Sequence, residues 1–162
     1  MNSTIDAKRQ MLRHTVATLA YRGGKAVRHA PEGFATFRIG ANTRTPEKIL
    51  AHIGDLLNWA SALAQGKHDW HNSAPRPWNQ EVERFFSALK KFDEHLAAEA
   101  PLEFSAEKLF QGPIADALTH VGQITMLRRL AGAPVRGENY FEADIMAGRV
   151  GAEQSDARTE FD

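Results

Sequence analysis

Apolar residues recur at the spacing of an α-helix in four long stretches of this chain. The first runs from about Thr4 to His29, and Gly23-Gly24 weakens its second half. Its apolar face is approximated by Ile5, Leu12, Val16 and Leu19. The second has the clearest pattern, with apolar positions at Ile49, Ile53, Leu56, Leu57, Ala60, Leu63 and Ala64. The third and fourth repeat it, at Trp78, Val82, Phe85, Phe86, Leu89, Phe92 and Leu96 and at Ile114, Ala117, Leu118, Val121, Ile124 and Leu130.

The residues that flank these stretches are typical of helix boundaries. Thr45-Pro46 predicts an N-cap followed by proline at the first helical position, and Gly66 is well placed to end that helix. The fourth helix is predicted to open at Gly112-Pro113 and to close at Gly132. No stretch alternates as a β-strand would. Four amphipathic helices of about 20 residues predict an all-α fold, a four-helix bundle, with an irregular C-terminal extension.

Composition narrows the classes of protein that fit this pattern. At 162 residues the chain is long enough for one domain with one core. It has no cysteine, which excludes disulfides, thiolate metal sites and a cysteine nucleophile. Its 20 basic and 20 acidic residues balance, which argues against nucleic acid as a partner. No apolar run approaches the roughly 20 residues of a membrane span and the N-terminus is too polar for a secretory signal, so we expect a cytoplasmic protein without a membrane partner.

Potential metal ligands occur on two of the predicted helices. His52 lies in the second, and Asp116 and His120 stand one helical turn apart in the fourth. At about 100° of rotation per residue, both positions fall at the edge of the apolar face, which suits a cleft between helices. Two imidazoles and a carboxylate can hold a divalent ion and leave positions open for water or substrate. Polar residues that merely hydrogen-bond across the seam between the helices would show the same pattern.

The order of these elements over about residues 1–145 resembles the DinB-like superfamily, whose members include thiol-dependent enzymes of the YfiT and mycothiol type. The similarity lies in the segments TPEKILAHIGDLLNWA, HVGQ, LRRLAG and ENYFEADI, the last resembling a C-terminal extension of the superfamily. In that family a histidine of the second helix and an H-x-x-x-H pair on the fourth bind one divalent metal. The resemblance implies a DinB/YfiT-type bundle domain over residues 1–145, a tail over 146–162, and His52 and His120 as ligands.

Asp116 departs from the family pattern, because it stands where the first histidine of the H-x-x-x-H pair, the second of the three expected ligands, would be. A carboxylate at this spacing keeps the number of ligands and favours harder ions, so the expected metal is Zn, Ni, Mn or Fe. Alternatively, Asp116 is a solvated residue in a member that has lost the site. Gln123, one turn beyond His120, is a candidate to hydrogen-bond a ligand or a metal-bound water, or is a plain amide in the seam.

The loop after the second helix and the C-terminal segment also contain residues for which we predict a role. The segment just after the second helix contains three potential metal ligands, His68, Asp69 and His71. Their composition alone would allow them to bind a metal, although loop clusters of this kind are more often solvated. In the C-terminal segment, the side chains expected to dock on the bundle are Tyr140, Phe141, Ile145 and Met146. The last dozen residues are polar and are expected to be loose.

Three functions remain open at this point. The first is a metal-dependent thiol S-transferase or hydrolase with unassigned catalytic residues, in which an external low-molecular-weight thiol replaces the cysteine that the chain lacks. The second is a non-catalytic, stress-related bundle that has lost the metal site. The third is a dimerisation module, since members of the superfamily often pair through bundle faces, and a homodimer is expected. The small-molecule substrate is not indicated by any motif.

Overall fold

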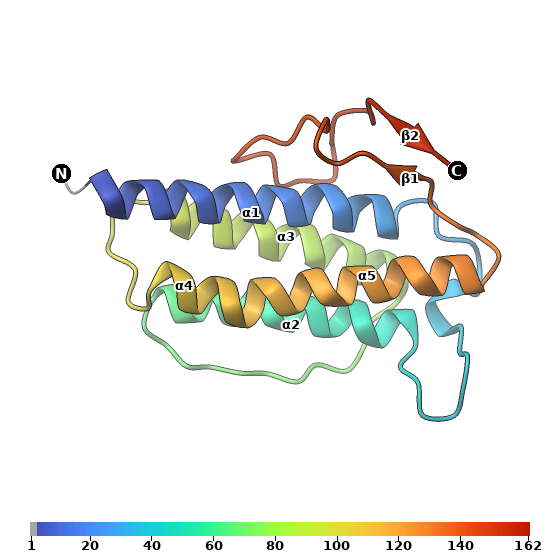
Figure 1. Ribbon diagram of the computed structural model, residues 1–162. Helices are drawn as coiled ribbons and strands as arrows, with labels where there is room; N and C mark the ends of the chain where they lie inside the picture. Colours follow the sequence, from blue (N-terminus) through green and yellow to red (C-terminus); the bar gives the residue numbers. More distant parts are fainter. Residues whose placement is uncertain (1–2) are drawn as a thin grey trace.

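Four long helices run side by side as a bundle in the computed structural model (Figure 1). They are α1 (Ser3–Val27), α2 (Pro46–Ala64), α3 (Trp78–Ala97) and α5 (Ala115–Leu130). A 3-10 turn, η1 (Phe34–Thr36), lies in the connection between α1 and α2. The structure describes residues 3–162, with side chains from residue 7 onward, so the expected contribution of Ile5 to the core lies outside the described side chains. The predicted all-α class is confirmed.

Helix α2 begins and ends where the sequence predicts. Thr45 is its N-cap, with an extended backbone at φ −74° and ψ 156°, and Pro46 is its first residue. The Thr45 hydroxyl makes no capping hydrogen bond, so the predicted side-chain cap is not formed, and Pro46 marks the start of the helix. At the other end Gly66 adopts a φ of +79°, the left-handed conformation that ends many helices. Both boundaries are local, which is why the pattern predicts them.

Helix α1 continues through Gly23-Gly24, where the sequence suggests a weak point. A Cβ atom placed on Gly23 would lie 2.5 Å from Cζ of Phe85 on α3. The glycine therefore allows α1 and α3 to approach more closely than any side chain at this position would permit. The destabilising effect of glycine on an isolated helix is offset here by close packing between helices.

The prediction that the fourth helix opens at Gly112-Pro113 is wrong. The helical path begins at α4 (Ala106–Leu109), passes through a π-helical turn η2 (Phe110–Ile114) and continues as α5. Ser105 is the true N-cap, and its hydroxyl accepts a hydrogen bond of 3.3 Å from the Lys108 amide. Pro113 has no N–H to donate, and the wider π-helical turn accommodates it without ending the helix.

The core fills the space between the helices, as the apolar stripes predict, except that Leu130 at the end of the last stripe is 53% exposed. Its largest fully buried apolar side chains are Leu19, Leu50, Ile53, Leu57, Phe85, Leu89, Phe92, Leu96, Leu109, Ile114 and Ile124. Arg128 closes one end of the bundle and is only 5% exposed. Its guanidinium donates to the carbonyls of Arg28 and Ala133, both at 2.8 Å, and thereby ties the ends of α1 and α5 together.

The long loop between α2 and α3, residues 65–77, runs along the outer side of α2 (Figure 1). It is held there through Asp55, which is buried on α2 and accepts hydrogen bonds from the backbone and the hydroxyl of Ser73 at 2.9 and 2.7 Å. Arg84 of α3 donates to Asp55 at 3.0 Å and to buried Glu81 at 2.8 Å. This network places the loop beside His52.

The C-terminal segment is more ordered than expected. Strand β1 (Gly137–Glu138) pairs antiparallel with β2 (Glu160–Phe161), so the last residues are not loose, and the pair lies against α1 (Figure 1). Glu138 is buried, and accepts hydrogen bonds from the Tyr21 hydroxyl and, at 2.8 Å, from the Lys25 ammonium. These contacts pair residues far apart in sequence, which a local pattern cannot reveal.

The docking predicted for the aromatic and aliphatic residues of this segment is confirmed in part. Tyr140 packs edge-on against Tyr21, with ring centroids 6.2 Å apart, and Ile145 packs against the core. Phe141 is 97% exposed and Met146 is 55% exposed, so neither docks as expected. Within residues 3–162 no helix has the length and apolar character needed to cross a membrane.

Candidate metal centre

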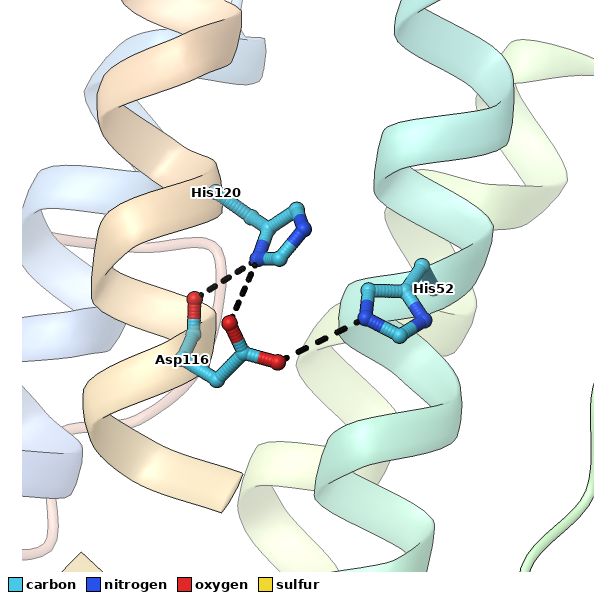
Figure 2. A group of neighbouring side chains, drawn as sticks. All are labelled: His52, Asp116 and His120. Atoms are coloured by element: carbon cyan, nitrogen blue, oxygen red, sulfur yellow. Dashed lines mark hydrogen bonds and ion pairs between the residues drawn. The ribbon is translucent and has the colours of Figure 1, made fainter. Parts of the chain in front are cut away.

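Three potential ligands meet at the seam between α2 and α5. His52 extends from α2, and Asp116 and His120 extend from adjacent turns of α5, so that all three side chains converge (Figure 2). Residues at i and i+4 share one helical face, which explains why Asp116 and His120 lie together. His120 is 8% exposed, whereas the side chain of Asp116 is 45% exposed. The cluster is therefore shielded by the bundle on one side and open on the other.

His120 is oriented by its own helix. Its Nδ1 lies 2.8 Å from the backbone carbonyl oxygen of Asp116 and 3.2 Å from the carboxylate Oδ1 of the same residue (Figure 2). Because a carbonyl oxygen can only accept, Nδ1 must carry the proton. This leaves the lone pair on Nε2. Histidines that bind metals in proteins are commonly oriented in this way, by donating their other N–H to a carbonyl or a carboxylate.

His52 approaches the same carboxylate from the opposite helix. Its Nε2 lies 3.6 Å from Oδ2 of Asp116, and the centroids of the His52 and His120 rings are 4.7 Å apart. One potential ligand atom from each residue lies within 4.8 Å of the others. Ligands bound to one ion at about 2.1 Å stand at most roughly 4.2 Å apart, so the donor set fits an ion after a small movement. The half-exposed Asp116 carboxylate is the ligand with room to make that movement.

The surroundings of His52 favour its neutral form. Burial lowers the pKa of His52 below its usual value, and the nearby His120 and Arg44 lower it further, while Asp116 acts in the opposite direction. A neutral imidazole keeps a lone pair for a metal ion, whereas a protonated one has none. The electrostatics therefore leave His52 available as a ligand near neutral pH.

Two pockets border the cluster. A pocket of about 480 Å³ opens beside His120 and Gln123, and a smaller one of about 250 Å³ opens beside His52. Arg44 lines both pockets, although the sequence pattern did not single it out. Its position directly before the Thr45-Pro46 helix start was the one available signal, since that boundary places Arg44 at the end of the helix that carries His52.

The other candidates are placed less centrally. Gln123 is exposed and lines the larger pocket, and its side chain makes no hydrogen bond with any described residue, so its predicted role stays a prediction. In the loop after α2, His71 Nε2 lies 3.2 Å from Asp69 Oδ2, and His68 packs against Trp59. Among the described residues, only His52, Asp116 and His120 form a group of three or more potential ligands close enough to share an ion.

An aromatic side chain from the loop completes the wall of the site. Trp70 packs edge-on against His52, with ring centroids 5.6 Å apart, and against Trp59 at 5.7 Å. It is 41% exposed, so one side of the indole faces solvent. The contribution of the loop to the cluster is this aromatic contact with His52, and its own potential ligands His68, Asp69 and His71 are not part of the cluster.

Comparison of the chain with protein-family models, with curated proteins and with solved structures gave no match. The chemistry of the site therefore has to be inferred from its own residues. Two imidazoles and one carboxylate, shielded on one side and bordered by pockets on the other, are what the fold provides.

Proposed function

We propose that this protein is a metal-dependent enzyme of the DinB-like kind, which binds one divalent ion through His52, Asp116 and His120. The observation that carries the proposal is the convergence of these three side chains, from two helices, within 4.8 Å. The reaction we propose is hydrolysis, or the transfer of an external thiol to an electrophile. The absence of cysteine from the chain means that any reacting thiol must come from a second small molecule.

The donor set supports Zn, Ni, Mn or Fe, since imidazole and carboxylate suit these ions and the chain has no thiolate to offer. A divalent ion held by three protein ligands supplies Lewis acidity, which lowers the pKa of a coordinated water or thiol. The protein's own contribution is orientation and shielding. The Asp116 carbonyl holds His120 in one tautomer, and Trp70 packs edge-on against the ring of His52.

Metal analysis of untagged protein tests the proposal most directly. Protein stripped with a chelator and titrated with Zn²⁺, Ni²⁺, Mn²⁺ and Fe²⁺ in a calorimeter is expected to bind one equivalent. His52→Ala and His120→Ala are each expected to abolish stoichiometric binding. The matched control is His14→Ala, which removes an exposed histidine on α1. Absence of stoichiometric metal from the wild-type protein, or equal loss in His14→Ala, contradicts the proposal.

One observation favours a second candidate, a non-catalytic bundle without a metal. The two carboxylate oxygens of Asp116 already face the two histidines, at 3.6 and 3.2 Å, and could join the helices without an ion. In that case His120→Ala lowers the melting temperature equally with and without chelator. If the site holds a metal, the chelator lowers the melting temperature of the wild-type protein and leaves that of His120→Ala unchanged.

The homodimer remains part of the proposal. Light scattering during gel filtration measures the mass of the particle directly, and a mass of two chains is expected. A mass of one chain across the working concentration range would remove the dimer from the proposal without affecting the metal site.

A further inference from the structure

The two pockets beside the candidate metal centre differ in chemistry. The larger, which we call the apolar pocket, is walled by Ile39, Ile49, Met126, Leu127 and Leu130 and has a volume of about 480 Å³. The smaller, which we call the polar pocket, has a volume of about 250 Å³ and is lined by Arg44 and Lys48 together with Asn72 and Ser73. His120 borders the first and His52 borders the second, so the cluster lies between them.

The polar pocket carries uncompensated positive charge. Arg44 and Lys48 are both exposed, and neither forms an ion pair with any residue the structure describes. Asp55 also lines this pocket, but its carboxylate is already occupied by Arg84 and Ser73. Glu47 lies between the two cations in sequence and lines neither pocket. The first turn of α2 adds the positive end of a helix dipole.

The apolar pocket has the opposite character. Met126 and Leu130 are 52% and 53% exposed on α5, and Ile39 is 53% exposed on the facing loop. Three large apolar side chains left in contact with water around one pocket form a surface suited to the apolar part of a ligand. Arg44 borders this pocket as well, so an ionic group held by its guanidinium can be joined to an apolar group in the same molecule.

We infer that the ligand of this site is a small amphiphilic anion, whose apolar part occupies the apolar pocket and whose carboxylate or phosphate is held by Arg44 and Lys48. The inference rests on the proposed function for the reaction itself, because the cluster between the pockets would then face the middle of the ligand. Arginine and lysine both bind carboxylate and phosphate, and arginine can do so through two parallel hydrogen bonds.

Four probes with one alkyl chain and different head groups test the inference. Octanoate, octyl phosphate, octan-1-ol and octylamine are titrated into chelator-treated protein, and binding is followed by backbone amide shifts in NMR spectra. At least one of the two anions is expected to bind about tenfold more tightly than the alcohol, because hydrogen bonds to charged groups are stronger than those to neutral ones. The comparison between octanoate and octyl phosphate tells a carboxylate site from a phosphate site. Equal binding of the anions and octylamine overturns the inference.

Variants separate the two pockets. Arg44→Gln and Lys48→Gln are expected to weaken anion binding about tenfold each while leaving octanol unchanged. Met126→Ser is expected to weaken all probes that bind. The matched control is Arg129→Gln, an exposed arginine on α5 that borders a different pocket, and it is expected to have no effect. An equal loss in Arg129→Gln overturns the inference, as does a Met126→Ser variant that changes the particle mass but not the binding of the probes.

The same samples distinguish failure of this inference from failure of the metal proposal. Protein that binds no metal, yet binds octanoate or octyl phosphate in a manner that depends on Arg44, retains the ligand class and loses the proposed metal chemistry. Protein that binds metal but does not prefer the anions retains the metal site and loses the ligand class. If the protein binds both the metal and the anions, the bound cation offsets the charge of Asp116. The anions are then expected to bind more tightly to metal-loaded protein than to stripped protein.

Discussion

The rings of His52 and His120 lie 4.7 Å apart, centroid to centroid, with their planes at 60°. They come from different helices, and the carboxylate of Asp116 lies within 3.6 Å of a nitrogen of each ring. Two neutral imidazoles can lie this close together without charge repulsion, whereas two protonated imidazoles would repel each other. A divalent cation coordinated by both rings and by the carboxylate would make this proximity favourable.

Replacing Asp116 is expected to change the affinity of the site for metal ions, by an amount that depends on the new side chain. Asp116→Ala removes a direct ligand and is expected to weaken binding by more than about 100-fold, because even the loss of an outer hydrogen-bonding partner typically costs 10–100-fold. Asp116→His should keep stoichiometric binding, with a shift in preference from Mn²⁺ toward Ni²⁺ or Zn²⁺. Calorimetric titration of both variants measures these differences. Affinities unchanged in Asp116→Ala would exclude the carboxylate as a ligand.

Trp70 is expected to report on binding at the cluster. Its ring centroid is 5.6 Å from that of His52, close enough for a paramagnetic ion bound there to quench its fluorescence. Titration with Ni²⁺ should therefore lower the tryptophan emission of the wild-type protein, and Trp70→Phe should remove a large part of that decrease. Trp78→Phe serves as the control, because Trp78 packs against Phe34 instead. If the decrease persists in full in Trp70→Phe, the ion binds elsewhere.

Gly54→Ala is expected to destabilise the bundle. A Cβ at this position would lie 2.7 Å from Cζ of Arg84, whose guanidinium bridges buried Asp55 and Glu81. Displacement of that guanidinium should lower the free energy of unfolding in urea by about 1–3 kcal/mol. Gly122→Ala in α5 is the matched control, since nothing lies within 4 Å of its added Cβ, and it should raise stability by about 0.5–1 kcal/mol. Equal effects at the two positions would disprove the steric explanation.

Tyr21 is expected to make stability depend on pH in the alkaline range. Burial raises the pKa of Tyr21, and the hydrogen bond that its hydroxyl donates to Glu138 raises it further. The protonated phenol thus stabilises the folded state below the unfolded pKa of about 10, and this contribution is lost as pH rises above it. The difference in unfolding free energy between the wild-type protein and Tyr21→Phe should shrink by about 1 kcal/mol between pH 10 and 11. A difference that stays constant over this interval would contradict the assignment.

Helices with a strong local signal were predictable. The apolar stripe of α2, its start at Thr45-Pro46 and its end at Gly66 all depend on residues within a few positions of one another. The one-turn spacing of Asp116 and His120 is equally local, so their common face could be read from the sequence. The start of the last helix could not be read from the sequence, because Pro113 suits both the first turn of a helix and a π-helical turn inside a longer helix.

The contacts that give the site its character join distant parts of the chain. Trp70 reaches His52 because the loop between α2 and α3 runs back along α2, where Asp55 and Ser73 hold it. Arg44, from the segment before α2, lines the polar pocket together with His52 and Ser73. The pairing of β1 with β2 similarly unites residues on either side of an irregular segment. Such contacts produce no repeating pattern in the sequence, because they do not depend on the residue types next to either partner.

The sequence by itself determined the class of fold, most helix positions and the identity of the potential ligands, because helical periodicity and ligand chemistry are local properties. Only the tertiary structure decided that His52 lies 3.6 Å from Asp116 rather than on an unrelated surface, and that pockets of opposite polarity border the cluster. The physical reason is that packing between helices selects the relative rotation and translation of each helix through the whole core. No single stretch of the chain contains that information.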